Sequence, residues 1–280
     1  MLLTRMPVLW LFTAFALIAF AANSVFCRLA LADGSMDASS FTVVRLLSAT
    51  IVLSLIALYQ RGGKVLAYGS WSAASCLFIY AAAFSYAYIS LATATGALIL
   101  FAAVQFTMIA VAIWQGQRLQ RWEWLGLLLA AMGFVWLTLP SAEAPSFSGL
   151  WLMTLSGVAW GAYTLLGHQS THAVLDTTAN FIRTMPAAGI LALWMFPSMH
   201  SSYASLMWAI ASGGLASAVG YAVWYQVLRH LSTPRAAVLQ LLVPLIAATG
   251  GVMIGEPVTI NLIIASSLIL GGVWLVVNAR

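Results

Sequence analysis

The chain has 280 residues, of which 63% are hydrophobic and only 6% are charged, and its mean hydropathy is +0.99. So few polar groups could not cover the surface of a globule of this size, which excludes a water-soluble fold. The net charge of +5 comes from scattered basic residues without a basic stripe, which argues against a nucleic-acid partner. Continuous apolar runs, instead of the weak alternation of a β-barrel, predict an all-α membrane protein whose solvent is the lipid bilayer.

Ten apolar runs have about the 20-residue length that a transmembrane helix needs. Turn-forming residues separate them, for example at Ala32–Ser35, Arg61–Lys64 and Gly255–Pro257. Connections as short as these place successive helices antiparallel to each other. The predicted spans are residues 8–31, 39–60, 70–91, 93–115, 122–139, 149–167, 178–197, 204–228, 233–254 and 259–278.

The first run imitates a signal peptide, because Arg5 precedes an apolar stretch and Ala19-Phe20-Ala21 resembles a cleavage site. The apolar run nevertheless continues to Ala32, which is long enough to span a bilayer. We therefore expect this segment to be retained as the first transmembrane helix.

Basic residues are distributed unevenly between the two sets of alternate connections. If the N-terminus is inside, the outer connections hold Asp33, Asp37, Glu143, Glu256 and His200, and no Lys or Arg. Because basic residues are retained on the cytoplasmic side, this asymmetry predicts a multi-pass membrane protein with both termini cytoplasmic. The inner positions hold Arg5, Arg61, Lys64, Arg118, Arg121, Arg229, Arg235 and Arg280.

The two halves of the chain, residues 1–140 and 141–280, carry similar patterns. In the first half Asp37–Phe41 precedes Arg45, and in the second half Asp176–Phe181 precedes Arg183. Five spans per half is an odd number, so the second copy must cross the membrane in the opposite sense. The sequence thus predicts ten transmembrane helices arranged as two inverted five-helix repeats. Further matches pair Leu91–Thr93 with Leu231–Thr233, and Gly116–Gln117 with Gly255–Glu256.

This paired pattern resembles the EamA-type transporters of the drug/metabolite transporter superfamily over essentially the whole chain, and within them the bacterial aromatic amino-acid exporter branch. The resemblance implies an inner-membrane secondary transporter that exports small organic molecules through a central cavity formed by helices one to four and six to nine. Helices five and ten would lie to the side, where they support dimers in some relatives, so a monomer and a homodimer both stay open.

The sequence departs from the family pattern at two places in its first half. The Gly-Glu pair typical of each repeat is intact at Gly255-Glu256 but reads Gly116-Gln117 in the first half. The proline typical of the preceding helix is found at Pro244 only. These departures leave open whether the first half is stiffer or only diverged.

Uncharged polar side chains lie deep inside four apolar runs, at Asn23, Tyr80, Gln105 and Gln240. Such groups are unfavourable in hydrocarbon unless they are paired or hydrated. One interpretation is hydrogen bonding between helices, and the other is a cavity in which they hold the ammonium or carboxylate of an amino acid.

Aromatic residues account for 12% of the chain, and several lie too far from the predicted span ends to act as interfacial anchors. They fit either a packed core or a cavity for a bulky apolar solute, which would stack on the rings. Pro244 interrupts its helix and is the predicted hinge. The predicted substrate-binding residues are Asn23, Tyr80, Phe101, Gln105, Trp160, Tyr163, Tyr221, Trp224 and Gln240.

Three arginines, which fall inside predicted spans, are not among the basic residues counted above. Arg28 and Arg45 fall near the outer face, where we expect pairing with Asp33 or Asp37, or snorkelling to the interface. Arg183 could pair with Asp176, two helical turns away. The alternative is that one of these arginines receives a carboxylate during passage.

No Asp or Glu lies in the middle of a span, which removes the usual acidic proton relay and leaves facilitated export as the simplest mechanism. The residues predict no cofactor and no metal site, and they lack the nucleophile, base or carboxylate pair of an enzyme. We therefore predict export of aromatic and other neutral amino acids by alternating access. A broad-specificity drug/metabolite efflux carrier, a solute channel and a membrane-embedded enzyme are the alternatives.

Overall fold

The computed structural model describes residues 6–60, 63–116, 120–138, 145–167, 170, 172–228, 230–231 and 239–278. Several predicted features lie outside this part of the chain: the repeat boundary at residues 140 and 141, Gln117, Glu143, the start of the ninth span, and the basic residues Arg5, Arg61, Arg118, Arg229, Arg235 and Arg280. The described helices are α1 (Met6–Leu31), α2 (Ala38–Tyr59), α3 (Trp71–Ala87), α4 (Thr93–Trp114), α5 (Arg121–Thr138), α6 (Phe147–Gly167), α7 (Ala173–Met195), α8 (Tyr203–Ala211), the π-helix η4 (Ser212–Val219), α9 (Gly220–Leu228), α11 (Leu242–Met253) and α12 (Ile260–Asn278).

In the described residues these helices form ten rods, because α8, η4 and α9 run on as one rod over Tyr203–Leu228. The ten rods correspond to the ten predicted runs. Six of them are long and apolar enough to cross a membrane by length and composition, namely α1, α2, α4, α6, the α7 segment and the α8–α9 rod. The fold is therefore that of a multi-pass membrane protein.

The seventh helix begins five residues before its predicted start at residue 178. It starts at Ala173 after His172, so Asp176 lies in its first turn. A carboxylate is favourable there, because the helix dipole is positive at its N-terminus. Residues 173–177, which were predicted to precede the span, form the first turn of the helix. Pro186 lies inside α7 without ending it.

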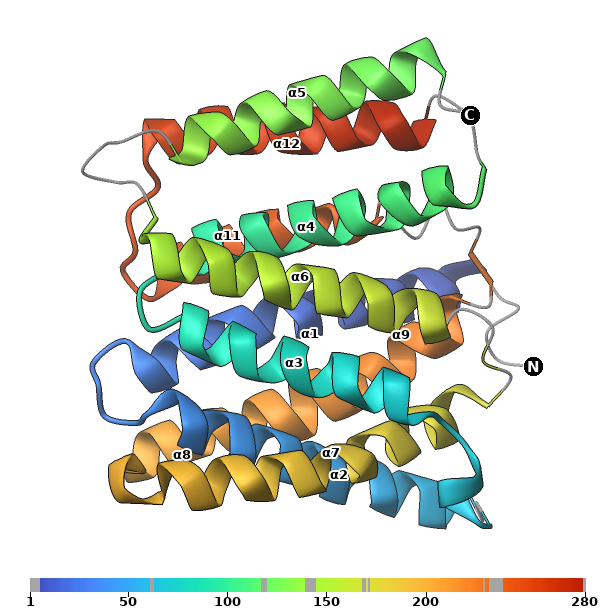
Figure 1. The fold of residues 1–280 in the computed structure, drawn as a ribbon, viewed down its shortest axis with the longest axis vertical. Helices are drawn as coiled ribbons and strands as arrows, with labels where there is room; N and C mark the ends of the chain where they lie inside the picture. The colour runs from blue at the N-terminus through green and yellow to red at the C-terminus, as the bar shows by residue number, and fades with distance from the viewer. Residues whose placement is uncertain are drawn as a thin grey trace.

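The rods cross the bundle in alternating directions, so that all connections gather at its two ends (Figure 1). The start of α1, the end of α12 and residues 63–70 lie at one end, which we call the terminal end. Residues 32–37, 88–92, 196–202 and 254–259 lie at the other, which we call the Asp37 end.

Helices α5 and α12 pack along each other at one side of the bundle (Figure 1). Their backbones approach so closely at Gly126 and Gly272 that a Cβ atom on either glycine would overlap the carbonyl oxygen of the other. Small residues permit this kind of contact between membrane helices. A Cβ on the neighbouring Gly271 would meet no heavy atom within 4 Å.

The two glycines of α12 therefore make a matched pair for a stability test. We expect Gly272→Ala to destabilise the protein by about 1–3 kcal/mol, because the added methyl group forces α5 and α12 apart. Gly271→Ala should have the melting temperature of the wild type. Thermal unfolding in detergent measures both, and an unchanged melting temperature for Gly272→Ala would contradict the packing of α5 on α12.

Candidate functional site

A small closed cavity lies inside the bundle, enclosed by helices from both halves of the chain. It offers about 10 Å³ to the centre of a water molecule, which is scarcely the room that one buried water needs. Its walls are thus nearly in contact with each other. The lining residues are Phe20, Asn23 and Ser24 of α1, Tyr80 and Phe84 of α3, Leu100 and Phe101 of α4, Trp160 of α6 and Tyr221 of α9.

Aromatic rings form most of the cavity wall. The ring centre of Trp160 lies 4.8 Å from that of Tyr80 and 4.8 Å from that of Tyr221. Phe20 packs edge-on against Trp160 at 5.9 Å and against Trp224 at 5.6 Å. Tilted and edge-to-face pairs at these distances are the favourable arrangements of aromatic rings. The wall can therefore accept a further flat ring if its helices separate.

Arg45 lies behind this wall and is buried, with 1% of its surface exposed. Its Nη2 donates hydrogen bonds to the hydroxyl oxygens of Tyr80, at 2.9 Å, and Tyr221, at 3.2 Å. Its Nε donates to Ser217 Oγ at 3.2 Å, whereas Nη1 has no hydrogen-bond partner. Its guanidinium carbon is 4.8 Å from the ring centre of Phe84. Three residues of the cavity wall thus contact this cation.

The prediction that Arg28 and Arg45 pair with Asp33 or Asp37 is wrong. Arg28 forms an ion pair with Glu256, at 2.9 Å. Among the described residues no carboxylate lies within 4.0 Å of Arg45. Position along α2 alone suggested the outer interface, but the side chain lies on the face of α2 that packs against η4.

The π-helix η4 places two serines next to Asn23. Ser212 Oγ donates to Asn23 Oδ1 at 2.6 Å, and Asn23 Nδ2 donates to Ser217 Oγ at 3.2 Å. In an α-helix, positions 212 and 217 would point about 140° apart. The wider i→i+5 turns of a π-helix bring them to one face. Ser217 consequently links Asn23 to Arg45 in one buried polar network.

The structure brings most, but not all, of the predicted binding residues together. Asn23, Tyr80, Phe101, Trp160 and Tyr221 line the cavity. Trp224 joins them through Phe20, and Tyr163 through its ring contact with Trp160 at 5.6 Å. Gln105 and Gln240 are buried but do not line it.

Pro244 lies in the first turn of α11, and a turn at Leu241 separates that helix from the helical residues Leu239 and Gln240. Because proline has no N–H, it cannot donate the helical hydrogen bond to the carbonyl of Gln240. A turn therefore lies three residues before Pro244, and the hinge at Pro244 stays a prediction.

Several residues at the cavity were not among the predicted binding residues. Arg45 was expected at the interface, with carboxylate binding by one of the three arginines as the alternative, and the helix neighbours of the predicted residues were not singled out. Phe20 and Ser24 are four residues apart, as are Tyr80 and Phe84, so each pair lies on one face of its helix. The helix face that carries a predicted binding residue could therefore have identified these neighbours. The missed residues are Phe20, Ser24, Arg45, Phe84, Leu100, Ser212 and Ser217.

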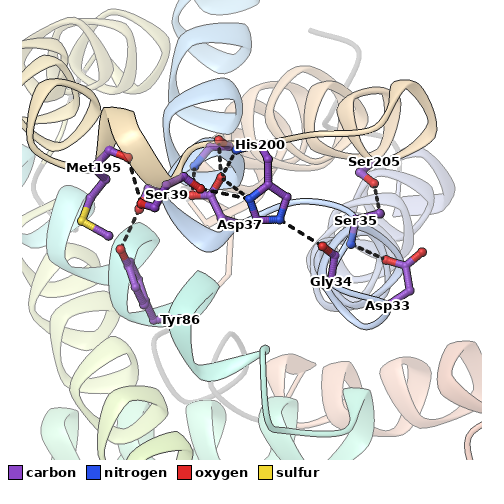
Figure 2. Close-up of polar contacts among 11 residues, drawn as sticks. Asp33, Gly34, Ser35, Asp37, Ser39, Tyr86, Met195, His200 and Ser205 are labelled. Atoms are coloured by element: carbon purple, nitrogen blue, oxygen red, sulfur yellow. Dashed lines mark hydrogen bonds and ion pairs between the residues drawn. The ribbon is translucent and has the colours of Figure 1, made fainter.

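At the Asp37 end, the connection after α1 is clamped to the connection after α7 (Figure 2). Met36 and Ser201 form an antiparallel bridge, flanked by hydrogen bonds from Asp37 N to His200 O, at 3.3 Å, and from Ser202 N to Ser35 O, at 2.9 Å. Asp37 also accepts the His200 N–H at 2.8 Å. These contacts between residues 34–37 and residues 198–202, which we call the clamp, hold α2 and α8 together where they begin.

A second contact at the same end joins three further elements. Glu256, in the connection between α11 and α12, binds Arg28 of α1 and accepts the N–H of Thr93 at 2.8 Å. The first turn of α4 is thereby tied to α1 and α11. This contact and the clamp together join the described connections at the Asp37 end.

At the terminal end, α7 holds the connection between α2 and α3. Arg183 donates to the carbonyl oxygens of Tyr68, at 2.5 Å, and Leu66, at 2.7 Å. Asp176 accepts the N–H of Gly69 at 2.7 Å. The predicted Arg183–Asp176 ion pair is therefore not found, because each side chain binds the backbone of residues 66–69 instead.

The carboxyl-terminal half, residues 147–278, matches the model of the EamA-like transporter family. An uncharacterized protein of Pseudomonas aeruginosa is 44% identical over 271 residues, which cover 96% of this chain and 94% of that protein. An uncharacterized transporter of Archaeoglobus fulgidus is 28% identical over 185 residues, which cover 62% of this chain and 64% of that protein. A crystal structure of a protein shares the fold, with a TM-score of 0.64 and 20% identity over 94% of this chain and 96% of that chain.

Two titratable groups in the clamp have shifted pKa values. Burial opposes ionisation of Asp37, but hydrogen bonds from Ser40 and from the His200 N–H outweigh burial and place its pKa below 3.8. The carbonyl oxygens of Ser198 and Gly34 interact with the His200 ring and raise its pKa above 6.5. Asp37 thus stabilises the clamp above about pH 3.8 and loses this effect as the pH falls through its lowered pKa. Protonated His200 stabilises the clamp below pH 6.5 and loses this effect as the pH rises through its raised pKa.

We expect the melting temperature of the wild type to fall more between about pH 5.5 and about pH 8.5 than that of His200→Gln. Thermal unfolding in detergent at the two pH values measures this difference. His172→Gln, at the terminal end, is the control and should keep the wild-type pH dependence. Equal pH dependence in His200→Gln and the wild type would contradict a role for His200 in the clamp.

Proposed function

We propose how this chain works from the premise that it belongs to the EamA-like transporter family and is a multi-pass membrane transporter. The proposed cargo is a small organic solute, specifically an aromatic or other neutral amino acid, which is exported by alternating access. The observation that carries the proposal is the closed, aromatic-walled cavity between helices of both halves. A cavity of this kind, at the interface of two repeats, is where secondary transporters bind their substrates.

The pattern of helix contacts supports an inverted repeat of residues 1–140 and 141–280. In such a repeat α6, α7, the α8–α9 rod, α11 and α12 correspond to α1 through α5. Contacts should then occur in matched pairs: α3 packs on α6 as the α8–α9 rod packs on α1, and α4 packs on α6 as α11 packs on α1. The contacts α2–α7, α4–α11 and α5–α12 each pair a helix with its own counterpart.

The same contacts suggest which helices move together. One group, which we call the α1 group, consists of α1, the α8–α9 rod and α11, and another, the α6 group, consists of α3, α4 and α6. The cavity lies between them, since α1 and α9 line one side and α3, α4 and α6 line the other. Rocking of the α1 group against the α6 group would open the cavity, and Pro244, next to the turn at Leu241, is the proposed hinge.

The charge distribution supports a cytoplasmic terminal end in the inner (plasma) membrane. The described connections at the Asp37 end carry Asp33, Asp37 and Glu256 and no Lys or Arg, whereas Lys64 and Arg121 lie at the terminal end. Basic residues favour the cytoplasmic side. In this orientation the clamp and the Arg28–Glu256 pair close the cavity to the outside, so export requires that they open.

Locking the clamp should therefore stop transport. Met36 and Ser201 are a non-hydrogen-bonded antiparallel pair, whose Cα atoms are about 4.5 Å apart in standard geometry, within the range of a disulfide. We expect the oxidised double variant Met36→Cys/Ser201→Cys to lose flux in proteoliposomes and to regain it on reduction.

The two single-cysteine variants, treated with the same oxidant, control for damage at other positions and should keep their flux. Full flux through the cross-linked protein would contradict opening at the Asp37 end.

The proposed cargo can be tested with purified protein in liposomes. We expect saturable counterflow of tryptophan and phenylalanine, weaker counterflow of threonine, and none of a nucleotide sugar, because the aromatic wall favours stacking of a flat apolar ring. A preference for the nucleotide sugar would refute the amino-acid proposal. Flux that does not saturate would indicate a channel instead of a carrier.

A further inference from the structure

We propose, resting on the transport function above, that Arg45 binds the carboxylate of the transported solute, so that the carrier selects aromatic monocarboxylates. The shared chemistry is one carboxylate next to one aromatic ring. An aromatic amino acid and a simple aromatic carboxylic acid both carry it, and the experiment below distinguishes them.

The first argument is that Arg45 has donors without partners. A guanidinium group has five N–H donors, and those on Nη1 bind nothing in the described structure although the side chain is 1% exposed. A charge inside the membrane is unfavourable unless a partner compensates it. The acceptors of Arg45 are all neutral hydroxyl groups, so they do not compensate the free energy of desolvating its charge. A neutral side chain would fill the same space without this desolvation penalty.

The second argument is the sign of the charge. None of the described carboxylates lies among the cavity walls, so Arg45 leaves this region with one uncompensated positive charge. A carboxylate compensates this charge, whereas a solute whose only charged group is a cation is repelled by it. The described carboxylates, all at helix ends or in connections, are Asp33, Asp37, Glu123, Asp176 and Glu256.

The third argument is the position of the hydroxyl groups. Tyr80 and Tyr221 both line the cavity and both bind Arg45, and the Tyr221 hydroxyl donates to the Tyr80 hydroxyl at 3.1 Å. When the walls separate, that hydrogen bond is lost, and both hydroxyl groups are free to donate to an incoming carboxylate. The planar guanidinium can bind the same carboxylate with two parallel hydrogen bonds.

The fourth argument is the distance between the cation and the rings. Arg45 lies 5.1 Å from the ring centre of Tyr80, and Tyr80 lies 4.8 Å from that of Trp160. A solute whose carboxylate reaches Arg45 therefore has its ring among Trp160, Phe101 and Tyr221. The ammonium of an amino acid would face aromatic rings there, since none of the described residues that line the cavity carries a carboxylate.

Binding to the wild type tests the inference without any substitution. Detergent-purified protein is melted in the presence of phenylalanine, phenylpropionate, phenylalaninamide or phenethylamine, and the same compounds compete with labelled phenylalanine counterflow. We expect the two carboxylates to stabilise and compete, and the amide and the amine to do neither. Equal effects of acid and amide would overturn the inference. The ranking of phenylalanine against phenylpropionate tells which carboxylate is preferred.

Substitution of Arg45 tests the residue itself. We expect Arg45→Gln to weaken carboxylate binding roughly tenfold to hundredfold, because it removes a charge-assisted hydrogen bond, and Arg45→Lys to weaken it less. Arg183→Gln is the matched control, since Arg183 binds backbone carbonyls at the terminal end, and it should keep the wild-type ranking. Unchanged phenylalanine binding in Arg45→Gln would overturn the inference.

The two readouts separate this inference from the proposed function. Carboxylate binding that depends on Arg45, without flux of any compound, would support Arg45 as the carboxylate-binding residue and contradict transport of aromatic acids. Phenylalanine flux that persists in Arg45→Gln would support transport and overturn the role of Arg45. If Arg45→Gln does not fold, the ranking of acid, amide and amine on the wild type decides.

Discussion

A positive charge inside a lipid-embedded bundle must be surrounded by groups that accept its hydrogen bonds, and this requirement organises the interior of the protein. Arg45 on α2 donates to Tyr80 from α3, Tyr221 from α9 and Ser217 from η4, and its Nη1 has no partner among the described residues. These three elements come from both halves of the chain. The network extends through Ser217 to Asn23 on α1, so this cation and its neighbours join three rods to α2, namely α1, α3 and the α8–α9 rod.

The helices were predictable from the sequence because a run of about 20 apolar residues is a local property. Asn23, Tyr80 and Trp160 were predictable for the same reason, since a polar or aromatic residue in the middle of such a run needs an explanation. The direction of the Arg45 side chain was not predictable, because it depends on how α2 rotates against η4.

The π-helix likewise has no local signal in the sequence. A Cβ on Gly213 would overlap Ser48 and the backbone of Arg45, so η4 fits against α2 only because this residue is glycine. The register of η4 is therefore set by a tertiary contact. Gln240 illustrates the opposite error: its polar side chain is buried as expected, but it does not line the cavity.

Arg45 also contacts both of the groups that the contact pattern separates. Tyr80 belongs to the α6 group, whereas Tyr221 and Ser217 belong to the α1 group. Rocking the two groups apart must lengthen at least one of these hydrogen bonds, which leaves the cation less well compensated. A carboxylate entering at that moment would replace the lost acceptors, so its binding would be strongest in the state where the walls have begun to separate. Solute binding and the opening of the cavity are then coupled through one side chain, without a proton or an ion as the second partner.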